Sequence, residues 1–242
     1  MLSGKTRLVA LIGDPVSHSL SPRMQNAAFA ARGLDWAYVA LAVDGNALAA
    51  SVSGLVALGF RGANVTAPHK QTVGGLCDEL DAFARRARSV NTLVIRDGRV
   101  IGSTTDTEAL AGVESRRAVV VGAGGAARAF AAALAERGTD VQTFSRGRAW
   151  PPETAGADLV VHATPVRDEL LFEPRPGQRV VDLAYRPDGG TTALVEAARA
   201  AGCERVIDGL EVLAHQGAAS FERWTGVRAP LEVMRAALTF AA

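Results

Sequence analysis

The chain is poor in lysine, cysteine and histidine. Of its 26 basic residues only Lys5 and Lys70 are lysines, and the remainder are arginines. The two cysteines, Cys77 and Cys203, stand alone and form no CxxC pair, which excludes a disulfide framework and favours a reduced, cytoplasmic protein. The four histidines show no spacing typical of metal ligands, so we expect no metal site.

Neither charge nor long apolar runs suggest a nucleic-acid or membrane partner. The formal net charge is only +1, so the composition gives no sign of nucleic-acid binding or of electrostatic membrane binding. No uninterrupted apolar stretch is long enough to span a bilayer, and the N-terminal segment is too short and interrupted for a signal peptide. With 242 residues, 48% of them hydrophobic, the chain can form one large globular domain or two modest ones.

Strand-like and helix-like segments alternate along the chain, which predicts parallel βαβ units in an α/β protein. Strands are expected at residues 7–12, 36–43, 62–65, 92–95, 100–102, 118–121, 140–144, 159–162, 179–183 and 206–207. The dipeptide Asp97-Gly98 predicts a hairpin turn between the fourth and fifth of these. Helices are expected from Ser21 to 32, from Asn46 to 58, from Pro68 onward, and at 78–88, 106–113, 125–137, 192–201, 210–224 and 230–241, with Ser21 and Asn46 as caps.

Residues 122–127 read GAGGAA and stand between an expected strand and an expected helix. This context is typical of dinucleotide binding, because Gly122 allows the tight turn and Gly124 lets the backbone approach a pyrophosphate. A glycine-rich turn without any ligand is the alternative.

The residues at the end of the following strand indicate whether the dinucleotide is NAD or NADP. NAD-binding proteins carry a carboxylate about 20 residues after the glycines, which bonds the ribose 2′-hydroxyl. This chain has Ser145-Arg146-Gly147-Arg148 there, with no acid and two guanidiniums that suit a 2′-phosphate. The sequence therefore favours NADP, although the two arginines could also be solvated loop residues.

Lys70 is a candidate acid–base residue. It ends the polar segment Asn64-Val65-Thr66-Ala67-Pro68-His69-Lys70 in a chain that otherwise uses arginine. Arginine stays protonated and serves poorly as a proton shuttle, whereas the protonation of lysine can be tuned. The alternative is a solvated lysine at a helix start.

Several segments together resemble the shikimate dehydrogenase family along nearly the whole chain. They are GDPVSHSLSP at 13–22, GANVTAPHK at 62–70, VNT at 90–92, TD at 105–106, the GAGGAA turn, and the stretch from DGL at 208–210 to QG at 216–217. The resemblance implies a mixed-sheet α/β substrate domain at 1–105, completed by C-terminal helices at 210–242, and a Rossmann-like NADP-binding domain at 106–209. The implied reaction, in a cleft, is the reversible NADP-dependent reduction of 3-dehydroshikimate to shikimate, a step of aromatic amino-acid biosynthesis.

The resemblance also assigns roles to residues. Lys70 and Asp106 match the catalytic pair, with His69 as the rival acid. Ser19 and Ser21 match residues that hold the substrate carboxylate. The other matches to substrate-binding residues are Thr66, Asn91 and Gln216 at the ring hydroxyls and Tyr185 near the carboxylate. The matches to cofactor-binding residues are Gly122, Ala123, Gly124, Gly125, Ala126, Ser145, Arg146, Leu183 and Gly209.

The chain departs from the family pattern in three places, two of them on the cofactor side. Thr104 replaces the usual Asn before Thr-Asp. The loop that usually reads Asn-Ala-Thr-Pro-x-Gly-Met is His162-Ala163-Thr164-Pro165-Val166-Arg167-Asp168. Trp150-Pro151-Pro152 cannot continue a helix, so the cofactor domain is expected to be trimmed after residue 144.

Two other functions stay open at this point. One is a paralogue acting on quinate or an aminoshikimate, with NAD as a further option. The other is a non-catalytic module that binds a shikimate-type ligand. As partners we expect only small molecules, with the chain a monomer or a homodimer.

Overall fold

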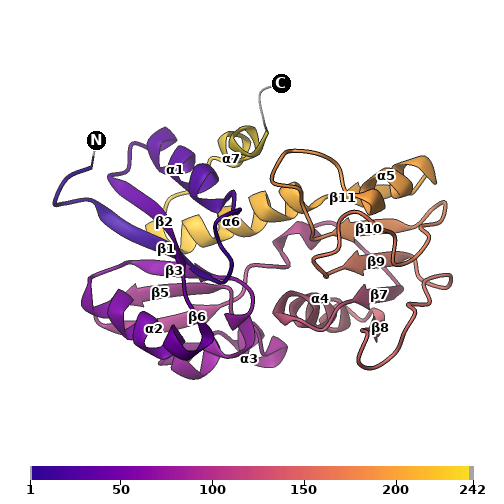
Figure 1. The fold of residues 1–242 in the computed structure, drawn as a ribbon, viewed down its shortest axis with the longest axis horizontal. Coiled ribbons are helices and arrows are strands. Elements are labelled where there is room, and N and C mark those ends of the chain that lie inside the picture. Colours follow the sequence, from indigo (N-terminus) through magenta and orange to yellow (C-terminus); the bar gives the residue numbers. More distant parts are fainter. Residues whose placement is uncertain (1, 240–242) are drawn as a thin grey trace. The chain divides into compact units, whose positions relative to one another are not determined.

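A computed structural model describes residues 2–239 of the chain, and these residues form two compact units (Figure 1). The first unit comprises the described residues up to Thr105 together with those from Ala214 onward. The second unit is Asp106–Leu213. Helix α6 (Gly209–Thr225) begins in the second unit and continues into the first, so the chain returns to its first unit within one helix.

The first unit is built on a six-stranded sheet in the order β2-β1-β3-β5-β6-β4. The strands are β1 (Arg7–Gly13), β2 (Trp36–Ala42), β3 (Gly62–Val65), β4 (Glu79–Leu80), β5 (Thr92–Arg96) and β6 (Arg99–Ser103). Strands β1, β2 and β3 run parallel, β5 is antiparallel to both β3 and β6, and β4 is parallel to β6. The mixed sheet predicted for this unit is therefore confirmed.

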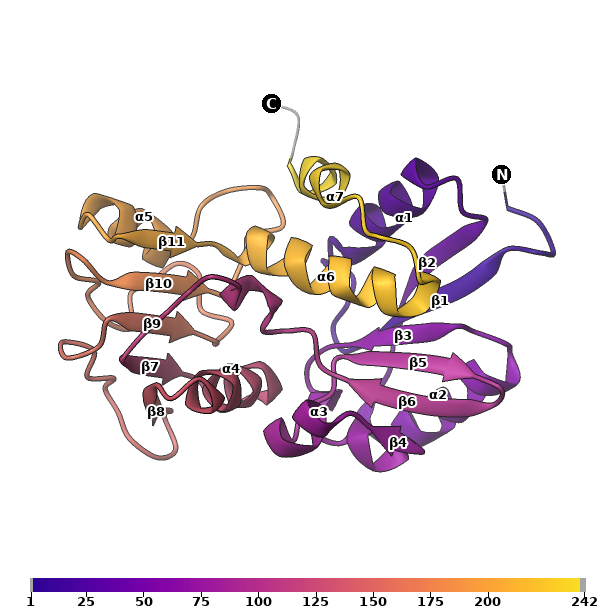
Figure 2. The same cartoon turned by 180° about the vertical axis from the view of Figure 1, so that it is seen from behind.

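Helix α2 covers one face of this sheet. The helices of the unit besides α6 are α1 (Ser21–Ala31), α2 (Leu48–Ala57), α3 (Ala82–Ala87) and α7 (Leu231–Leu238), all visible in Figures 1 and 2. Val52 and Leu55 of α2 belong to the same buried cluster as Ile12 of β1, Val65 of β3 and Leu93 of β5. Because side chains alternate along a strand, these strand residues point to one common face, which leaves the other face to further elements.

The second unit is a five-stranded sheet, all parallel, in the order β11-β10-β9-β7-β8. Its strands are β7 (Arg117–Val121), β8 (Asp140–Phe144), β9 (Leu159–His162), β10 (Arg179–Asp182) and β11 (Arg205–Ile207), and its helices are α4 (Gly125–Glu136) and α5 (Ala193–Ala200). β7 and β9 are buried from Ala118 and Leu159 onward, as expected for parallel strands covered on both faces. The predicted Rossmann-like class is confirmed.

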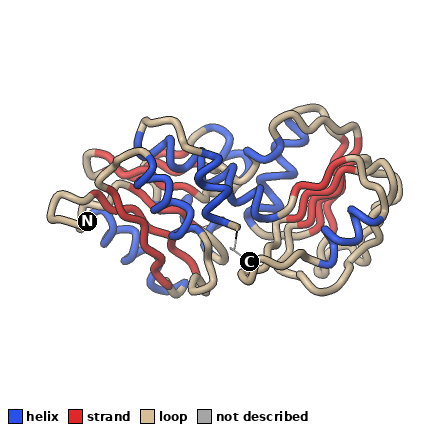
Figure 3. Tube along the Cα trace, turned by 90° about the horizontal axis from the view of Figure 1, so that it is seen from above, coloured by secondary structure: helices blue, strands red, loops and turns tan. Residues whose placement is uncertain are grey.

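The connection after β8 is a loop. Between Phe144 and Leu159, the stretch that joins β8 to β9 in Figure 1, the described chain contains turns and one isolated bridge, Ser145 to Ala149, but no helix. Figure 3 draws the loops of both units in tan. The Trp-Pro-Pro sequence in this segment predicted this outcome, because proline removes a backbone donor and collides with the preceding helical turn. The second unit thus lacks a crossover helix between β8 and β9.

Two predicted helix caps are wrong. The N-cap of α1 is Leu20, and Ser21 already belongs to the first turn. Asn46 lies inside a 3-10 turn, Gly45–Ala47, whose cap is Asp44. The Asp44 carboxylate accepts the Asn46 N–H at 2.8 Å and so takes the capping role one step earlier, and α2 begins only at Leu48.

The helix predicted at 78–88 is confirmed only at residues 82–87, as α3. Glu79–Leu80 forms strand β4 beside β6, and the helix begins only after Asp81. The carboxylate of Asp81 accepts the backbone N–H of Ala84 at 2.6 Å, which caps the short α3. Arg88 ends the helix in the left-handed conformation, with φ of 51°.

The helices expected from Pro68 and at 106–113 are reduced to two short 3-10 turns and one, respectively. These turns are His69–Gln71, Val73–Leu76 and Glu108–Leu110. Gly74 and Gly75 interrupt the first stretch, and glycine is a poor helix former. The C-terminal helix predicted at 230–241 is described as α7, Leu231–Leu238, and residues 240–241 lie outside the described residues.

Candidate active site

Ser19 and Ser21 lie together where the loop after β1 enters α1. Ser19 is half-buried, and its Oγ accepts the backbone N–H of Ser21 at 3.2 Å. Ser21 is 5% exposed. The two residues therefore share one helix N-terminus, where the helix dipole favours a negatively charged group such as a carboxylate.

His69 and Lys70 share a 3-10 turn but have different surroundings. His69 is 2% exposed, and its Nε2 lies 2.7 Å from the carbonyl oxygen of Val43. A carbonyl oxygen can only accept a hydrogen bond, so Nε2 carries the proton and donates a hydrogen bond to Val43. Lys70 is half-buried, and its own carbonyl accepts the N–H of Val90 at 2.8 Å. Of the two residues, Lys70 is the better acid–base candidate.

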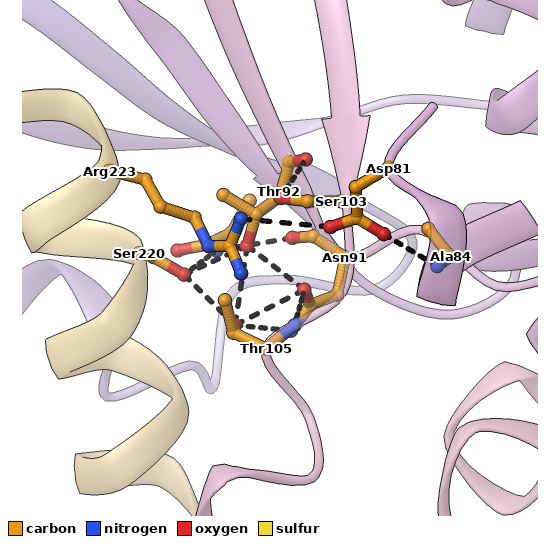
Figure 4. Close-up of polar contacts among 9 residues, drawn as sticks. Asp81, Ala84, Asn91, Thr92, Ser103, Thr105, Ser220 and Arg223 are labelled. Carbon is orange, nitrogen blue, oxygen red and sulfur yellow. Dashed lines mark hydrogen bonds and ion pairs between the residues drawn. The ribbon is translucent and has the colours of Figure 1, made fainter. Parts of the chain in front are cut away.

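Asn91 lies at the centre of a buried polar network (Figure 4). Its Oδ1 accepts the backbone N–H of Thr105 at 2.8 Å, and a backbone N–H can only donate. The amide nitrogen must therefore face the other way, where it donates to Gln216 Oε1 at 3.3 Å. The backbone of Thr105 thus determines the orientation of the Asn91 amide, and through it that of Gln216.

Hydroxyl and amide groups extend this network behind Asn91. Ser220 Oγ lies 2.8 Å from Thr92 Oγ1 and 3.1 Å from Thr105 Oγ1, and it accepts Asn64 Nδ2 at 2.9 Å. The Tyr38 hydroxyl in turn donates to Asn64 Oδ1 at 2.9 Å. All of these residues are buried. The network joins β2, β3, β5 and α6, so Asn91 and Gln216 have a rigid support.

The first unit holds most of the residues assigned to substrate and catalysis. It contains Lys70, Ser19, Ser21, Thr66, Asn91 and Gln216. Within it, Thr66 is joined to the Lys70 turn, because its carbonyl accepts the His69 N–H at 3.0 Å. The second unit contains Asp106, which is 5% exposed, and Tyr185, which is half-buried in the loop after β10. Asp106 follows Thr105 directly in the chain, so the polar network fixes the residue before it.

The glycine turn of the second unit has the shape that a dinucleotide requires. Gly122 has φ of +140°, and a Cβ there would lie 2.6 Å from the carbonyl oxygen of Ala163. Gly124 is the N-cap of α4 without any side-chain cap, and a Cβ there would meet no atom within 4 Å. Open space thus lies at Gly124, at the start of α4, where the first N–H groups of a helix have no partner within the helix. Ala123, Gly125 and Ala126 are its neighbours in the chain. These residues fit a pyrophosphate.

Alanine substitutions at these two glycines should affect different properties, stability at Gly122 and cofactor binding at Gly124. We expect Gly122→Ala to lower the free energy of unfolding by about 1–3 kcal/mol, because the methyl group would collide with backbone and the positive φ is strained. We expect Gly124→Ala to leave stability unchanged but to weaken NADPH binding, because its methyl group would occupy the space in front of the helix. Urea denaturation and calorimetric titration measure the two quantities. Equal losses of stability and of NADPH affinity in the two variants would contradict the roles assigned to Gly122 and Gly124.

Ser145 and Arg146 lie directly beyond the carboxyl end of β8, which pairs with β7. Ligands of parallel α/β sheets bind at this edge of the strands. Arg146 and Arg148 are exposed, as a phosphate-binding role requires. Leu183 follows β10 at the same edge and donates its N–H to the His162 carbonyl at 2.9 Å. Gly209 is buried at the start of α6, where a Cβ would come within 2.3 Å of the carbonyl oxygen of Ala184.

A buried His–Asp pair closes the same edge of the sheet. Asp182, fully buried at the end of β10, accepts hydrogen bonds from His162 Nδ1 at 2.8 Å, Thr192 Oγ1 at 2.6 Å and the Ala184 N–H at 3.0 Å. The other ring nitrogen of His162 lies 2.6 Å from Thr164 Oγ1. The pair therefore ties together the loops that follow β9 and β10.

A second set of contacts reinforces this connection. The N–H of Ala193 donates to the Arg167 carbonyl at 2.8 Å, and Arg186 forms an ion pair with Asp168. Arg167 and Asp168 stand where the family pattern has glycine and methionine. The altered loop is thus held by contacts to the loop after β10.

The Asp182 pair and the network around Ser220 were missed by sequence reasoning. The sequence marks His162 as a departure from the family pattern and indicates no partner for it. Its partner lies 20 residues away on another strand, and only the parallel pairing of Asp182 with His162 brings them together. Ser220 follows Gln216 by one helical turn, and this spacing was the only signal that could have indicated it.

The two cysteines give no sign of a reactive thiol. Burial raises the pKa of Cys77 to about 11, with a smaller contribution from the neighbouring Asp78. Burial also raises the pKa of Cys203. Both thiols therefore stay protonated at neutral pH. The described residues contain no group of His, Cys, Asp or Glu that could hold a metal ion, and no described helix has the length and apolarity to cross a membrane.

Comparison with known families gives two matches at the ends of the chain. Residues 11–93 match the family described as shikimate dehydrogenase substrate binding domain. Residues 209–239 match the family described as shikimate 5′-dehydrogenase C-terminal domain. The first match contains Lys70, Asn91 and both serines, and the second contains Gln216 and Ser220.

Relatives in other organisms extend the similarity over nearly the full length. A shikimate dehydrogenase (NADP(+)) of Rubrobacter xylanophilus is 43% identical, with 98% of this chain and 97% of the relative covered. One of Moorella thermoacetica is 42% identical over an alignment of 276 residues, with 96% of this chain and 92% of the relative covered. Since this chain has only 242 residues, the relative contains residues that this chain lacks.

A solved structure agrees. The shikimate 5-dehydrogenase of Thermus thermophilus, crystallised in complex with NADP(H) and shikimate, is 34% identical and superposes with a TM-score of 0.84, covering 96% of this chain and 98% of its own. Taken with the polar substrate-side network and the open glycine turn, this similarity shows that the chain belongs to the shikimate dehydrogenase family.

Proposed function

We propose that this protein catalyses the reversible NADP-dependent reduction of 3-dehydroshikimate to shikimate. The observation that carries the proposal is the presence, in one chain, of a supported set of substrate-side polar residues and a glycine turn with open space before α4. Relatives about 40% identical bear the name of this activity. The residues assigned to NADP lie in the second unit, and most of those assigned to the substrate lie in the first.

Lys70 serves as the acid–base residue in this proposal. NADPH, when bound, supplies the hydride for the ketone. The Lys70 ammonium stabilises the negative charge that forms on the carbonyl oxygen and donates the proton, and the neutral amine takes it back in the reverse direction. His69 is a poor rival because its Nε2 proton is committed to Val43.

Asp106 acts as the partner of Lys70. A carboxylate beside a lysine favours its protonated form and limits its motion. Two features support this role: Asp106 is almost fully buried, and the residue before it, Thr105, is held by Asn91. Asn91 adjoins Val90, which bonds the backbone of Lys70.

Substrate orientation falls to the remaining polar residues. Ser19 and Ser21, at the N-terminus of α1, hold the carboxylate, with Tyr185 as a third contact. Thr66, Asn91 and Gln216 bond the ring hydroxyls. The fixed amide orientations of Asn91 and Gln216 support this role, because preset donors and acceptors discriminate between hydroxyl patterns.

An activity assay tests this function. With shikimate as substrate we expect NADP⁺ to be reduced, seen as absorbance at the nicotinamide band, and NAD⁺ to be reduced at least about tenfold less efficiently, since a lost charged hydrogen bond costs about 1.5–3 kcal/mol. Quinate is the control substrate, because preferential oxidation of quinate would indicate a quinate dehydrogenase paralogue. Binding of shikimate without any oxidation in the presence of NADP⁺ would contradict the proposal and favour a non-catalytic module.

Location and assembly belong to the same proposal. Both cysteines are free, which is consistent with a reducing compartment, and we propose that the enzyme works in the cytoplasm. Its partners would be the small-molecule substrates and NADP, with the chain acting as a monomer or a homodimer.

A further inference from the structure

The loop after β8 contains an exposed tryptophan that no role assigned so far explains. Trp150 is 40% exposed, whereas Trp224 is 6% exposed and Trp36 stacks on Phe29. An exposed tryptophan in a short loop leaves a large apolar face in water. Trp150 also stands in the segment that replaces a crossover helix in this chain.

The backbone of this loop forms a small closed turn. Ser145 and Ala149 exchange two backbone hydrogen bonds, of 3.2 and 3.1 Å, and the Arg148 N–H donates to the Ser145 carbonyl at 2.9 Å. These bonds fix the base of the turn at the carboxyl end of β8. Arg146 and Arg148 therefore lie at its tip, at the sheet edge where dinucleotides bind.

The tryptophan holds one of these two arginines. The guanidinium carbon of Arg146 lies 5.7 Å from the centre of the Trp150 ring, within the range of a cation–π interaction. A guanidinium that rests against a ring has already lost much of its rotamer freedom. Its N–H groups can then donate hydrogen bonds to an anion without a further loss of side-chain entropy.

The charge around the turn also favours an anion. From Val141 to Pro152 the chain contains two arginines and no acidic residue. No carboxylate of this segment can thus pair with Arg146 in place of a ligand. A phosphate monoester, with two or more oxygens in one plane, matches the paired N–H groups of a guanidinium.

We propose that Trp150 is a specificity-determining residue that positions Arg146 for the 2′-phosphate of NADP(H). This inference rests on the proposed function and deepens it, because the preference for NADP over NAD then depends on a residue of the trimmed loop. Trp150 acts through Arg146 and makes no contact of its own with the phosphate.

Substitutions at Trp150 test this role by calorimetric titration. We expect Trp150→Leu to raise the dissociation constant for NADPH about two- to fivefold, the range of an exposed cation–π contact, and to leave that for NADH unchanged. Trp150→Phe retains an aromatic face and should bind NADPH nearly as the wild type does. An equal loss for NADPH and NADH would overturn the proposal, because it would indicate a contact with the part common to both.

A double-mutant cycle separates positioning from general damage to the loop. We expect Arg146→Ala to weaken NADPH binding about tenfold or more, and Trp150→Leu to cost nothing further in that background. Arg148→Ala is the matched control, with the same loop and the same change of charge, and should weaken NADPH binding less than Arg146→Ala. Additive effects of Trp150→Leu and Arg146→Ala would overturn the proposal.

A nicotinamide-free probe distinguishes failure here from failure of the proposed function. Adenosine 2′,5′-bisphosphate carries the 2′-phosphate, and adenosine 5′-monophosphate lacks it. If the wild type binds the bisphosphate more tightly and Trp150→Leu removes part of that difference, the proposal holds even when no shikimate is oxidised. If the wild type binds both probes equally, the proposal is overturned whatever the enzyme activity.

Discussion

Replacing Lys70 with alanine is expected to lower turnover by a factor of about 10²–10⁴, the usual contribution of a positioned acid–base group. The reason is chemical: without the ammonium, neither a proton donor nor a local positive charge meets the forming alkoxide. The affinity for NADPH should not change, because the assigned cofactor residues all lie in the second unit and Lys70 lies in the first. Steady-state assays and calorimetric titration of NADPH measure the two quantities on the same preparation.

Two substitutions serve as controls for Lys70. Lys70→Arg keeps the positive charge but replaces a tunable proton donor with a group that stays protonated, so turnover should remain low if proton transfer matters more than charge. Lys5→Ala removes the other lysine, which is exposed near the N-terminus, and should leave turnover unchanged. Near-normal turnover in Lys70→Ala would remove this residue from the mechanism.

The sequence predicts the fold well because local patterns decide most of it. Strands β7, β9 and β10 coincide with runs of valine, and the Trp-Pro-Pro segment predicts that no helix follows β8. Errors concentrate at helix starts, where one carboxylate can move the boundary. Asp44 acts as the cap where Asn46 is expected, and Asp81 caps α3 three residues after the expected helix start at residue 78. Periodicity alone does not reveal which of several neighbouring polar residues will accept the first N–H.

The site is only partly predictable, for a different reason. Lys70 stands out because its residue type is scarce, and the glycine turn because its spacing is distinctive. The supporting residues have no local signal: Asn64, Thr92 and Ser220 are common polar residues that meet only when β3, β5 and α6 are assembled. Long-range hydrogen bonds depend on tertiary structure, and a single sequence does not show it.

Replacing Asp182 with alanine is expected to lower the free energy of unfolding of the second unit by about 3–5 kcal/mol, because three buried donors lose their common acceptor. The side chain is fully buried, and its removal leaves the donors of His162, Thr192 and Ala184 without their acceptor. Each unsatisfied buried donor costs about 1–3 kcal/mol, and the empty space adds to this. Hydrogen exchange of peptides from β9 and β10 locates the loss, and urea denaturation measures its size.

Asp168→Ala is the matched control, since it removes the same side chain from the same unit. The Asp168 carboxylate is 78% exposed and pairs with Arg186, and an exposed ion pair of this kind contributes at most about 1 kcal/mol. For Thr192→Val we expect a loss in the free energy of unfolding between those of Asp182→Ala and Asp168→Ala. This variant removes one donor to Asp182 and the side-chain cap of α5. If Asp182→Ala were no more destabilising than Asp168→Ala, the buried pair would not hold the unit together.

The Asp182 variant should also weaken NADPH binding, and this links stability to function. Asp182 and His162 end β10 and β9, and the loop after β9 contains Ala163, whose carbonyl lies against Gly122. Loosening the pair therefore loosens the backbone that shapes the glycine turn. Shikimate affinity should fall much less than NADPH affinity, because the serines, Asn91 and Gln216 lie in the first unit and only Tyr185 lies in the loop after β10. A variant that lost shikimate and NADPH affinity equally would indicate global unfolding rather than a local role for the pair.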